Sequence, residues 1–350
     1  MAKAEVTGKA GASEGILPSQ AIRALIREGE VKLAEPLLAN QLQPASLDLR
    51  LGTVAYRVRA SFLPGRGEKV SAKLDDLQLH AISLSQGAVL ETGCVYVAPL
   101  LESLDLPPDL CAATNPKSST GRLDVFTRVI ADGVSAFDQI PAGYSGQLYA
   151  EICPQTFPIV VRKGSRLSQI RFRRGGMDAK PVQDIPLSVD LSGGETGLVG
   201  YRAKRHTGLV DVDAVGARPM IDYWEPIYVR EKKRLILDPD QFYILASKEA
   251  VHVPPDQAAE MVPFNPLVGE FRVHYAGFFD PGFGHEEAGG AGSRAVLEVR
   301  SHKVPFILED GQIIGRLVYE RLTDKPELLY GRDLSSHYQA QGLKLSKHFK

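Results

Sequence analysis

Cysteine is scarce in this sequence of 350 residues, which contains only Cys94, Cys111 and Cys153. The three are odd in number and widely spaced, and no two of them form a C-x-x-C pair. A disulfide framework is therefore not expected in a chain of this size. The pattern is typical of buried thiols in a protein of the reducing cytosol.

The sequence also lacks an excess of charge of either sign. Its 41 Lys and Arg residues are matched by 42 Asp and Glu residues, so the formal net charge is −1. No overall positive field would attract nucleic acid. No apolar run approaches the length of a membrane span, and the first thirty residues do not resemble a signal peptide. We expect a soluble cytoplasmic protein that binds neither nucleic acid nor a membrane.

The length and the local patterns indicate two β domains. A chain this long is expected to form two cores. One short helix is predicted over 18–30, capped by Ser19 and ended by Gly29. Many short apolar runs separated by Gly, Pro and Asp predict an antiparallel β barrel or sandwich. Strands are expected near 43–52 (half-buried), 54–58, 81–84, 95–98, 148–152, 158–161 and 169–172.

Composition places the boundary between the two domains. Residues 173–200 are rich in Gly and Pro and poor in apolar side chains, so we expect a linker there. The predicted domains are 1–195 and 196–350. Residues 325–350 are polar and basic, which predicts a tail lying over a surface.

Four landmarks recur in the second half of the chain, all displaced by the same number of positions. LETGCVY at 90–96 resembles LDPDQFY at 237–243, and Pro-Pro-Asp at 107–109 recurs at 254–256. Glu151 in YAEI recurs as Glu298 in VLEV, and SQIRF at 168–172 recurs as GRLVY at 315–319. A constant offset across four landmarks indicates an internal duplication of one β domain.

The stretch NPKSSTGR at 115–122 combines a lysine, hydroxyls, a flexible glycine and an arginine. Converging backbone N–H groups, hydroxyl donors and a planar guanidinium are suited to phosphate oxygens. The spacing is not that of a Walker loop. A solvated loop with a capping serine explains the same residues and is favoured when this stretch is considered alone. The counterpart at 262–269, VPFNPLVG, lacks the lysine and the arginine.

Taken together, these motifs resemble the dCTP deaminase branch of the dUTPase superfamily in a tandem two-domain form. QPASLDLRLG at 43–52 is similar to the first family motif, and KSSTGR at 117–122 to its R-S-S-x-x-R phosphate loop. Ala276 with DPG at 280–282 resembles the nucleoside pocket, and VLE at 296–298 the strand with the catalytic glutamate. YQAQG at 338–342, with Tyr330 upstream, resembles the nucleotide-covering tail. The resemblance implies two tandem dUTPase-like β-barrel domains of β-clip or jelly-roll type, with a few short helices.

The resemblance also implies roles for individual residues. Glu298 is expected to be the general acid and base, with Ser118 and Arg122 orienting the water; Glu151 is the duplicate position. Substrate-binding positions are Lys117, Ser119, Ala276, Asp280, Val296, Leu297, Tyr330, His337 and Gln341. His337 departs from the family pattern, which has a lysine there. The phosphate loop of a first-half barrel is expected to face the pocket of a second-half barrel.

The resemblance therefore predicts hydrolytic deamination of dCTP to dUTP and ammonia, in the supply of dUMP and dTTP. Mg²⁺ is expected to enter with the triphosphate, with no protein side chain as a metal ligand. Zinc is not expected, because the H-x-E and P-C-x-x-C signature of zinc deaminases is missing. The resemblance implies a homo-oligomer whose barrels are arranged as pseudo-trimers, and it suggests dTTP as a candidate inhibitor.

Three alternatives remain open from the sequence. A dUTP pyrophosphatase shares the fold, and a bifunctional enzyme would convert dCTP to dUMP. A non-catalytic nucleotide-binding regulator would explain the altered loop of the second half. Individually, a glutamate in an apolar strand and an Asp-Pro-Gly turn are also ordinary structural features.

Overall fold

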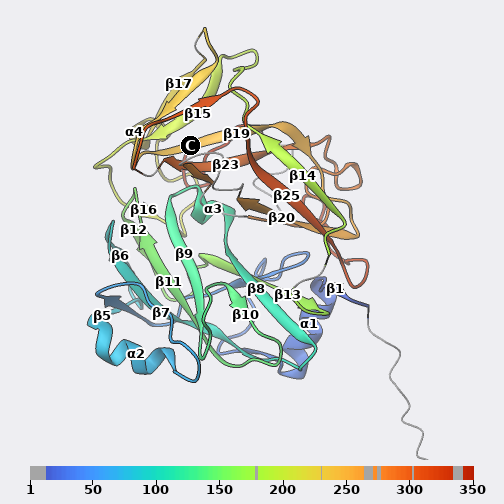
Figure 1. The fold of residues 1–350 in the computed structure, drawn as a ribbon. Helices are drawn as coiled ribbons and strands as arrows, with labels where there is room; N and C mark the ends of the chain where they lie inside the picture. The colour runs from blue at the N-terminus through green and yellow to red at the C-terminus, as the bar shows by residue number, and fades with distance from the viewer. Residues whose placement is uncertain are drawn as a thin grey trace, which may run out of the picture.

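The computed structural model is mainly β with few short helices, as predicted (Figure 1). It describes residues 13–177, 180–229, 231–263, 271–273, 277–301, 303–333 and 342–350. In Figure 1 the blue and green first half lies below the yellow and red second half. None of the described helices is long and apolar enough to cross a membrane.

Two antiparallel sheets and one small mixed sheet form the first half. One sheet has the order β1-β13-β8-β10 with β3 beside β13, and the other β5-β4-β7-β11-β9 with β2 beside β7. The third has the order β16-β12-β6. The strands are β1 (Gly15–Ile16), β2 (Val31–Leu33), β3 (Leu47–Leu49), β4 (Val54–Val58), β5 (Gln78–Ser83), β6 (Ala88–Leu90), β7 (Val95–Asp105), β8 (Leu110–Pro116), β9 (Val125–Ala131), β10 (Gln139–Ile140), β11 (Ser145–Pro154), β12 (Ile159–Val161), β13 (Ser168–Arg174) and β16 (Val210–Asp211).

Two helices, α1 (Ser19–Glu28) and α2 (Val70–Leu77), lie on the outside of the first half (Figure 1). The predicted capping role of Ser19 is wrong, because α1 begins at Ser19 and Pro18 is its N-cap without a side-chain hydrogen bond. The predicted end at Gly29 is confirmed. Gly29 has a φ of 80°, which returns its N–H to the last turn, and glycine adopts that conformation without strain.

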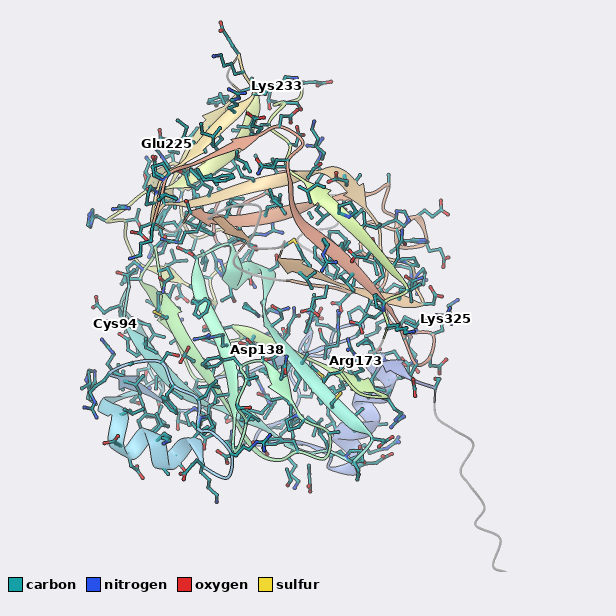
Figure 2. The ribbon with its side chains drawn as sticks, viewed as in Figure 1. Cys94, Asp138, Arg173, Glu225, Lys233 and Lys325 are labelled. Atoms are coloured by element: carbon teal, nitrogen blue, oxygen red, sulfur yellow. The ribbon has the colours of Figure 1, made fainter. Side chains whose placement is uncertain are left out.

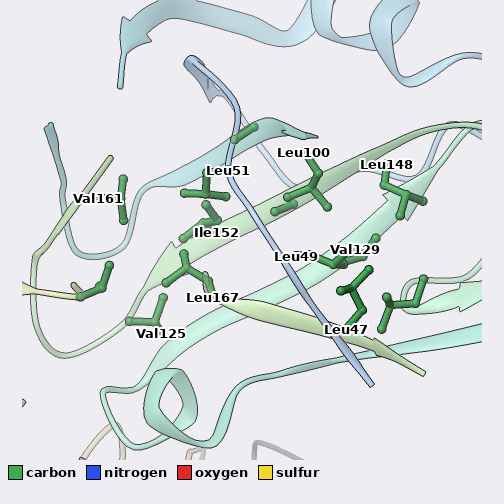
Figure 3. Close-up of a cluster of buried hydrophobic side chains, with 14 of the residues drawn as sticks. Leu47, Leu49, Leu51, Leu100, Val125, Val129, Leu148, Ile152, Val161 and Leu167 are labelled. Atoms are coloured by element: carbon green, nitrogen blue, oxygen red, sulfur yellow. The ribbon is translucent and has the colours of Figure 1, made fainter. Parts of the chain in front are cut away.

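The region 43–52 is buried on both faces, so the prediction of a half-buried strand is wrong. Leu47, Leu49 and Leu51 enter the first core among Val125, Val129 and Ile152 (Figure 3). Asp48 is also buried, at 1% exposure, and its carboxylate pairs with Lys117 and Arg166 instead of meeting water. An ion-paired carboxylate explains how a polar residue occupies the buried second face.

Three sheets form the second half, in the orders β14-β25-β20-β22, β17-β15-β19-β23-β21 and β18-β24. The elements are β14 (Gln183–Ser188), β15 (Leu198–Ala203), α4 (Met220–Tyr223), β17 (Trp224–Tyr228), β18 (Arg234–Leu237), β19 (Phe242–Val251), β20 (Gln257–Pro263), β21 (Phe271–Val273), β22 (Phe278–Phe279), a 3-10 turn (Glu286–Ala288), β23 (Ser293–Ser301), β24 (Phe306–Glu309) and β25 (Ile313–Arg321). Strand β14 lies inside the stretch predicted as a linker, and it pairs with β25 of the second half. The boundary at residue 195 stays a prediction.

The register of the strands supports the duplication. Glu151 is paired with Val97 across β11 and β7, and Glu298 is paired with Ile244 across β23 and β19, so the two pairs occupy equivalent positions of the repeat. A hydrogen bond from a backbone N–H to a tyrosine hydroxyl is also repeated at equivalent positions of the two halves. The Glu91 N–H donates to Tyr96 Oη at 3.1 Å, and the N–H of Asp238 donates to Tyr243 Oη at 3.0 Å.

The two halves pack closely and exchange segments. Strand β16, which comes from the second half of the chain, pairs in parallel with β12 of the first. Arg173 of β13 lies at the seam (Figure 2) and forms an ion pair with Glu320 of β25, the residue at the duplicated position. A contact between equivalent positions places these two strands beside an approximate symmetry axis.

The end of the chain is not only a surface tail, and that prediction is wrong for residues 342–350. Leu345, Ser346 and His348 are buried, and Phe349 packs against Trp224 and Phe157. The Lys350 N–H donates to the Arg218 carbonyl at 3.0 Å, and the Met220 N–H donates to the carbonyl of Lys350 at 3.0 Å. Two aromatic contacts and these backbone hydrogen bonds fix the segment in place.

Candidate active site

A cavity of about 300 Å³ opens between the two halves. Helix α3 (Ser118–Gly121) of the first half forms one wall, and strands β22 and β23 of the second half form the other. In Figure 1, α3 lies at the upper end of the first half, next to the second half. The lining residues include Asp48, Lys117, Ser118, Ser119, Arg122, Arg166, Gln169, Asp213, Phe279, Asp280, Phe283, Val296, Glu298, Tyr330 and Lys347.

The stretch 115–122 is held rigidly at this seam. The Lys117 N–H donates to the Leu167 carbonyl at 2.9 Å, and the Lys117 ammonium pairs with Asp48. Ser119 and Arg122 are buried, at 7% and 3% exposure. The structure therefore brings Lys117, Ser118, Ser119 and Arg122 together at one wall of the cavity, and the alternative of an ordinary solvated loop does not fit this burial.

Complementary charges join residues 122–124 of the first half to strand β23 of the second half. Glu298 and Arg300 are two residues apart on one strand and therefore share a face. Arg300 forms an ion pair with Asp124 of the first half. The Arg122 guanidinium is close enough to lower the pKa of Glu298. The first half thus supplies Arg122 and Asp124, and the second half supplies Glu298 and Arg300. These opposite charges hold the two walls of the cavity in a defined relative position.

Glu298 has the most unusual environment of the predicted residues. It lies in β23 between the buried residues Leu297 and Val299, and its own exposure is 4%. Loss of hydration raises the pKa of its carboxyl to about 8, against the opposing effect of Arg122. A carboxyl with this pKa can hold or release a proton near neutral pH, as a general acid or base must.

Glu151 at the duplicate position lies in a different setting and is not among the residues lining the cavity. The Arg128 guanidinium donates to its Oε1 through Nε at 3.2 Å and Nη2 at 2.7 Å. Arg128 also lies over the Phe137 ring, 3.5 Å from the ring centre. Both hydrogen bonds reach Oε1, and Oε2 of Glu151 is buried without a hydrogen-bond partner among the described residues, so Arg128 holds one oxygen of this carboxylate in a salt bridge.

Asp280 lines the cavity and is buried opposite Arg171 of the first half. The Arg171 Nη2 is 3.5 Å from Asp280 Oδ1, and its Nη1 donates to the Ala259 carbonyl at 3.0 Å. Burial raises the pKa of Asp280, and Arg171 opposes this effect. Gly282 follows in the turn with a φ of 92°, where a side chain would crowd the Tyr330 carbonyl.

The remaining predicted residues divide into three groups. Val296 and Tyr330 line the cavity, and the Tyr330 N–H donates to the Pro281 carbonyl at 2.9 Å. Leu297 points away from it into the second core, so a side-chain contact with substrate is not supported for this residue. Ala276, His337 and Gln341 lie outside the described residues.

Several lining residues were missed from the sequence. Asp48 is distant along the chain from both Lys117 and Arg166, and its carboxylate pairs with these two cations in the folded sheet, where β3 lies beside β13. Asp48 could have been found, because it lies within the recognised motif 43–52. Lys347 carried no signal, because it belongs to a stretch that composition alone describes as a polar tail. Among the described residues, no group of three or more His, Cys, Asp or Glu could hold a metal ion.

Comparison with known proteins gives two matches to family models, one for each half. Residues 13–176 match the 2′-deoxycytidine 5′-triphosphate deaminase N-terminal domain, and residues 168–349 match the C-terminal domain of the same family. The curated relatives include a dCTP deaminase of Natronomonas pharaonis, 28% identical over 200 residues. The aligned region covers 55% of this chain and 95% of that protein.

Two further relatives carry the name dCTP deaminase, dUMP-forming. A protein of Parafrankia sp. named dCTP deaminase, dUMP-forming, is 31% identical over 191 residues, which are 54% of this chain and 91% of that protein. One of Aquifex aeolicus with the same name is 29% identical over 160 residues, 45% of this chain and 81% of its own length. These relatives align with about half of this chain.

A solved structure matches most of the chain. The crystal structure of 2′-deoxycytidine 5′-triphosphate deaminase from Agrobacterium tumefaciens is 62% identical, with a TM-score of 0.85. The alignment covers 89% of this chain and 99% of that one. With both family models matched in order, the chain belongs to the dCTP deaminase family.

Proposed function

We propose that this protein hydrolytically deaminates dCTP to dUTP and ammonia in pyrimidine deoxynucleotide metabolism. One observation carries the proposal. A single cavity has a buried carboxyl with a pKa of about 8 in one wall and a cluster of cations in the other. The cations suit a phosphate chain, and Glu298 suits proton transfer at the base.

The reaction needs one water, one proton acceptor and one proton donor. The Glu298 carboxylate takes a proton from the water as the water oxygen bonds to C4 of cytosine, and it passes that proton to N3, which receives the electron pair of the C4–N3 double bond. Glu298 then takes the proton of the new C4 hydroxyl and gives it to the amino group. The bond between C4 and the amino nitrogen breaks with its electron pair on nitrogen, the C4 carbonyl forms, and ammonia leaves. One residue acting in both directions contributes roughly 10²–10⁴-fold to the rate. Ser118 and Arg122, which line the same cavity, orient the water and steady Glu298.

The remaining lining residues divide between the two ends of the substrate. Lys117, Ser119 and Arg122 hold the triphosphate, which enters as its Mg²⁺ complex. Asp280 accepts a hydrogen bond from the deoxyribose 3′-hydroxyl, and the backbone of Val296 reads the cytosine edge. The tail residues Tyr330 and Gln341 help to hold the triphosphate, His337 stands at a phosphate-contact position of the family, and the backbone near Ala276 joins that of Val296 at the cytosine edge. Ala276, His337 and Gln341 lie outside the described residues.

A second candidate is a bifunctional enzyme that continues from dUTP to dUMP and pyrophosphate. The names of the Aquifex and Parafrankia relatives favour it, because both proteins are named dUMP-forming. The assay that separates the two supplies dCTP and measures ammonia and pyrophosphate together. Ammonia alone supports the deaminase, and both products support the bifunctional enzyme. A dUTP pyrophosphatase gives neither product from dCTP but releases pyrophosphate when dUTP is supplied instead, and a nucleotide-binding regulator gives no product from either nucleotide.

The finer architecture belongs to the same proposal. We infer that each half is a dUTPase-like β barrel and that barrels of more than one chain assemble as pseudo-trimers in the cytoplasm. The match of each half to a domain of one family supports two family domains within one chain. Inhibition by dTTP follows if the cavity admits a second pyrimidine triphosphate, which competition against dCTP tests.

A further inference from the structure

The C-terminal segment 342–350 contributes a side chain to the cavity that the family resemblance does not assign. Lys347 lines the cavity together with Lys117 and Arg166. Burial lowers the pKa of the Lys347 ammonium, and the nearby charges of Lys117 and Arg166 lower it further. The carboxylates of Asp48 and Asp213 are also near enough to act on it, and they oppose this shift. The Lys347 ammonium therefore lies within the field of two cations and two carboxylates at this end of the cavity.

Hydrogen bonds on either side of Lys347 fix its position. The Ser346 hydroxyl donates to the Ser119 carbonyl of the phosphate loop at 2.8 Å. The Gly216 N–H donates to the Lys347 carbonyl at 2.9 Å, and the Arg218 N–H donates to the carbonyl of His348 at 3.1 Å. The backbone that carries the Lys347 ammonium is therefore already in place before a ligand binds.

The same segment contacts the phosphate loop a second time. Arg122 Nη1 donates to the Lys344 carbonyl at 3.0 Å. The loop and the C-terminal segment are thus one bonded unit, although they come from opposite halves of the chain. A ligand seated on the loop meets Lys347 without any further movement of the backbone.

Among the described residues that line this end of the cavity, cations outnumber the carboxylates other than Asp280 and Glu298, whose pKa is raised by burial. Lys117, Arg122, Arg166 and Lys347 line it, against the carboxylates Asp48 and Asp213. Asp280 and Glu298 add less negative charge, because burial raises the pKa of both. A polyanionic ligand would relieve the repulsion among the four cations.

We propose that Lys347 is a phosphate-binding residue, supplied by the docked C-terminal segment, that completes the site for the triphosphate. The inference rests on the proposed function. The inference also concerns position 337, where this chain has His337 and the family pattern has a lysine. Lys347 would supply a lysine to the triphosphate from farther along the chain.

The test is Lys347→Met in the full-length protein, with Lys350→Met as the matched control. Lys350 is exposed in the same segment and does not line the cavity. Loss of one charge-assisted hydrogen bond is expected to weaken dCTP binding about tenfold or more. KM for dCTP should rise by a similar factor with kcat within about twofold, and Lys347→Arg should recover most of the affinity.

Fluorescence of the single tryptophan distinguishes two explanations for weaker dCTP binding: loss of a direct Lys347 contact, and undocking of the C-terminal segment. Trp224 packs against Phe349, with ring centres 5.9 Å apart, so its emission reports whether the segment stays docked. Unchanged emission in Lys347→Met with weakened dCTP binding supports the proposal. Equal affinity in Lys347→Met and Lys350→Met, or an emission change that accompanies the loss, overturns it.

Binding and turnover are measured separately so that the two proposals can fail separately. If the wild-type protein binds dCTP by calorimetry but releases no ammonia, the proposed deamination fails and Lys347 is still tested by affinity. If the wild-type protein does not bind dCTP, both proposals are overturned.

Discussion

At the scale of single residues, the two duplicated glutamates differ in their partners. Glu298 lies in the cavity wall near Arg122, whereas Glu151 is held by Arg128. We expect Glu298→Gln to lower kcat for dCTP deamination by at least about 10²-fold, because the amide cannot exchange the proton. Ammonia release under saturating dCTP measures the effect.

Glu151→Gln is the matched control for that substitution. It leaves the cavity unchanged and weakens a buried ion pair, so a lower free energy of unfolding is expected with kcat nearly preserved. The assignment fails if Glu151→Gln abolishes deamination while Glu298→Gln retains it.

The raised pKa of Glu298 predicts a pH dependence of catalysis. The carboxylate form accepts the proton from water, so kcat/KM is expected to rise with pH through an apparent pKa of about 8 in the free enzyme. A pH–rate profile from mildly acidic to mildly alkaline conditions measures it. A profile that stays flat across this range would contradict a Glu298 base.

The same group predicts a pH dependence of stability with a definite sign. The folded protein keeps the Glu298 proton up to about pH 8, while the unfolded chain releases it near the ordinary value of 4.5. The folded state therefore binds more protons in this window, and the contribution of Glu298 to the free energy of unfolding falls as pH rises. Urea unfolding at the two ends of the window should show a smaller decrease in Glu298→Gln than in wild type.

At the scale of elements, the sequence predicted helices and strands that can be recognised from the apolar pattern of their own residues. The strand predicted at 54–58 coincides with β4, and the helix predicted at 18–30 is α1. The sequence missed β14 and the docking of residues 342–350, because both depend on partners far along the chain. Apolar periodicity cannot show that Phe349 will meet Phe157 and Trp224.

The docked C-terminal segment predicts a coupling between packing and affinity. Phe349→Ala removes the edge contacts with Phe157 and Trp224, each worth about 0.5–1.5 kcal/mol beyond burial. We expect a changed Trp224 emission and a higher KM for dCTP, because Ser346 and Lys347 leave the phosphate loop with it. Ile221→Ala is the control, since Ile221 is 56% exposed. An unchanged KM together with a changed emission would separate docking from substrate binding.

At the scale of the whole molecule, the sequence predicted the complementary halves but not their arrangement within one chain. The constant offset between the repeats and the altered copy at 262–269 indicated that each half keeps one wall. Whether those walls meet within a chain or between chains depends on the packing of β13 against β25 and of β16 against β12, which no local pattern encodes. The structure forms the cavity from both halves of a single chain.

This arrangement predicts the outcome of mixing two inactive variants. Glu298→Gln damages the second-half wall, and Arg122→Gln damages the first-half wall. When both walls of a cavity come from one chain, co-expression of the two variants should give no more deamination than either variant alone. Recovery of a substantial fraction of wild-type activity in the mixture would show that cavities form between chains.

The division of the cavity between the halves has an evolutionary consequence. After the duplication, each copy had to keep only the wall that its neighbour lacked, so substitutions at the other wall became neutral. Lys117 and Glu298 would remain under selection, whereas their counterparts Phe264 and Glu151 would be free to serve packing or to drift. The gene would then behave as two interdependent modules, and losing either one would remove the site altogether.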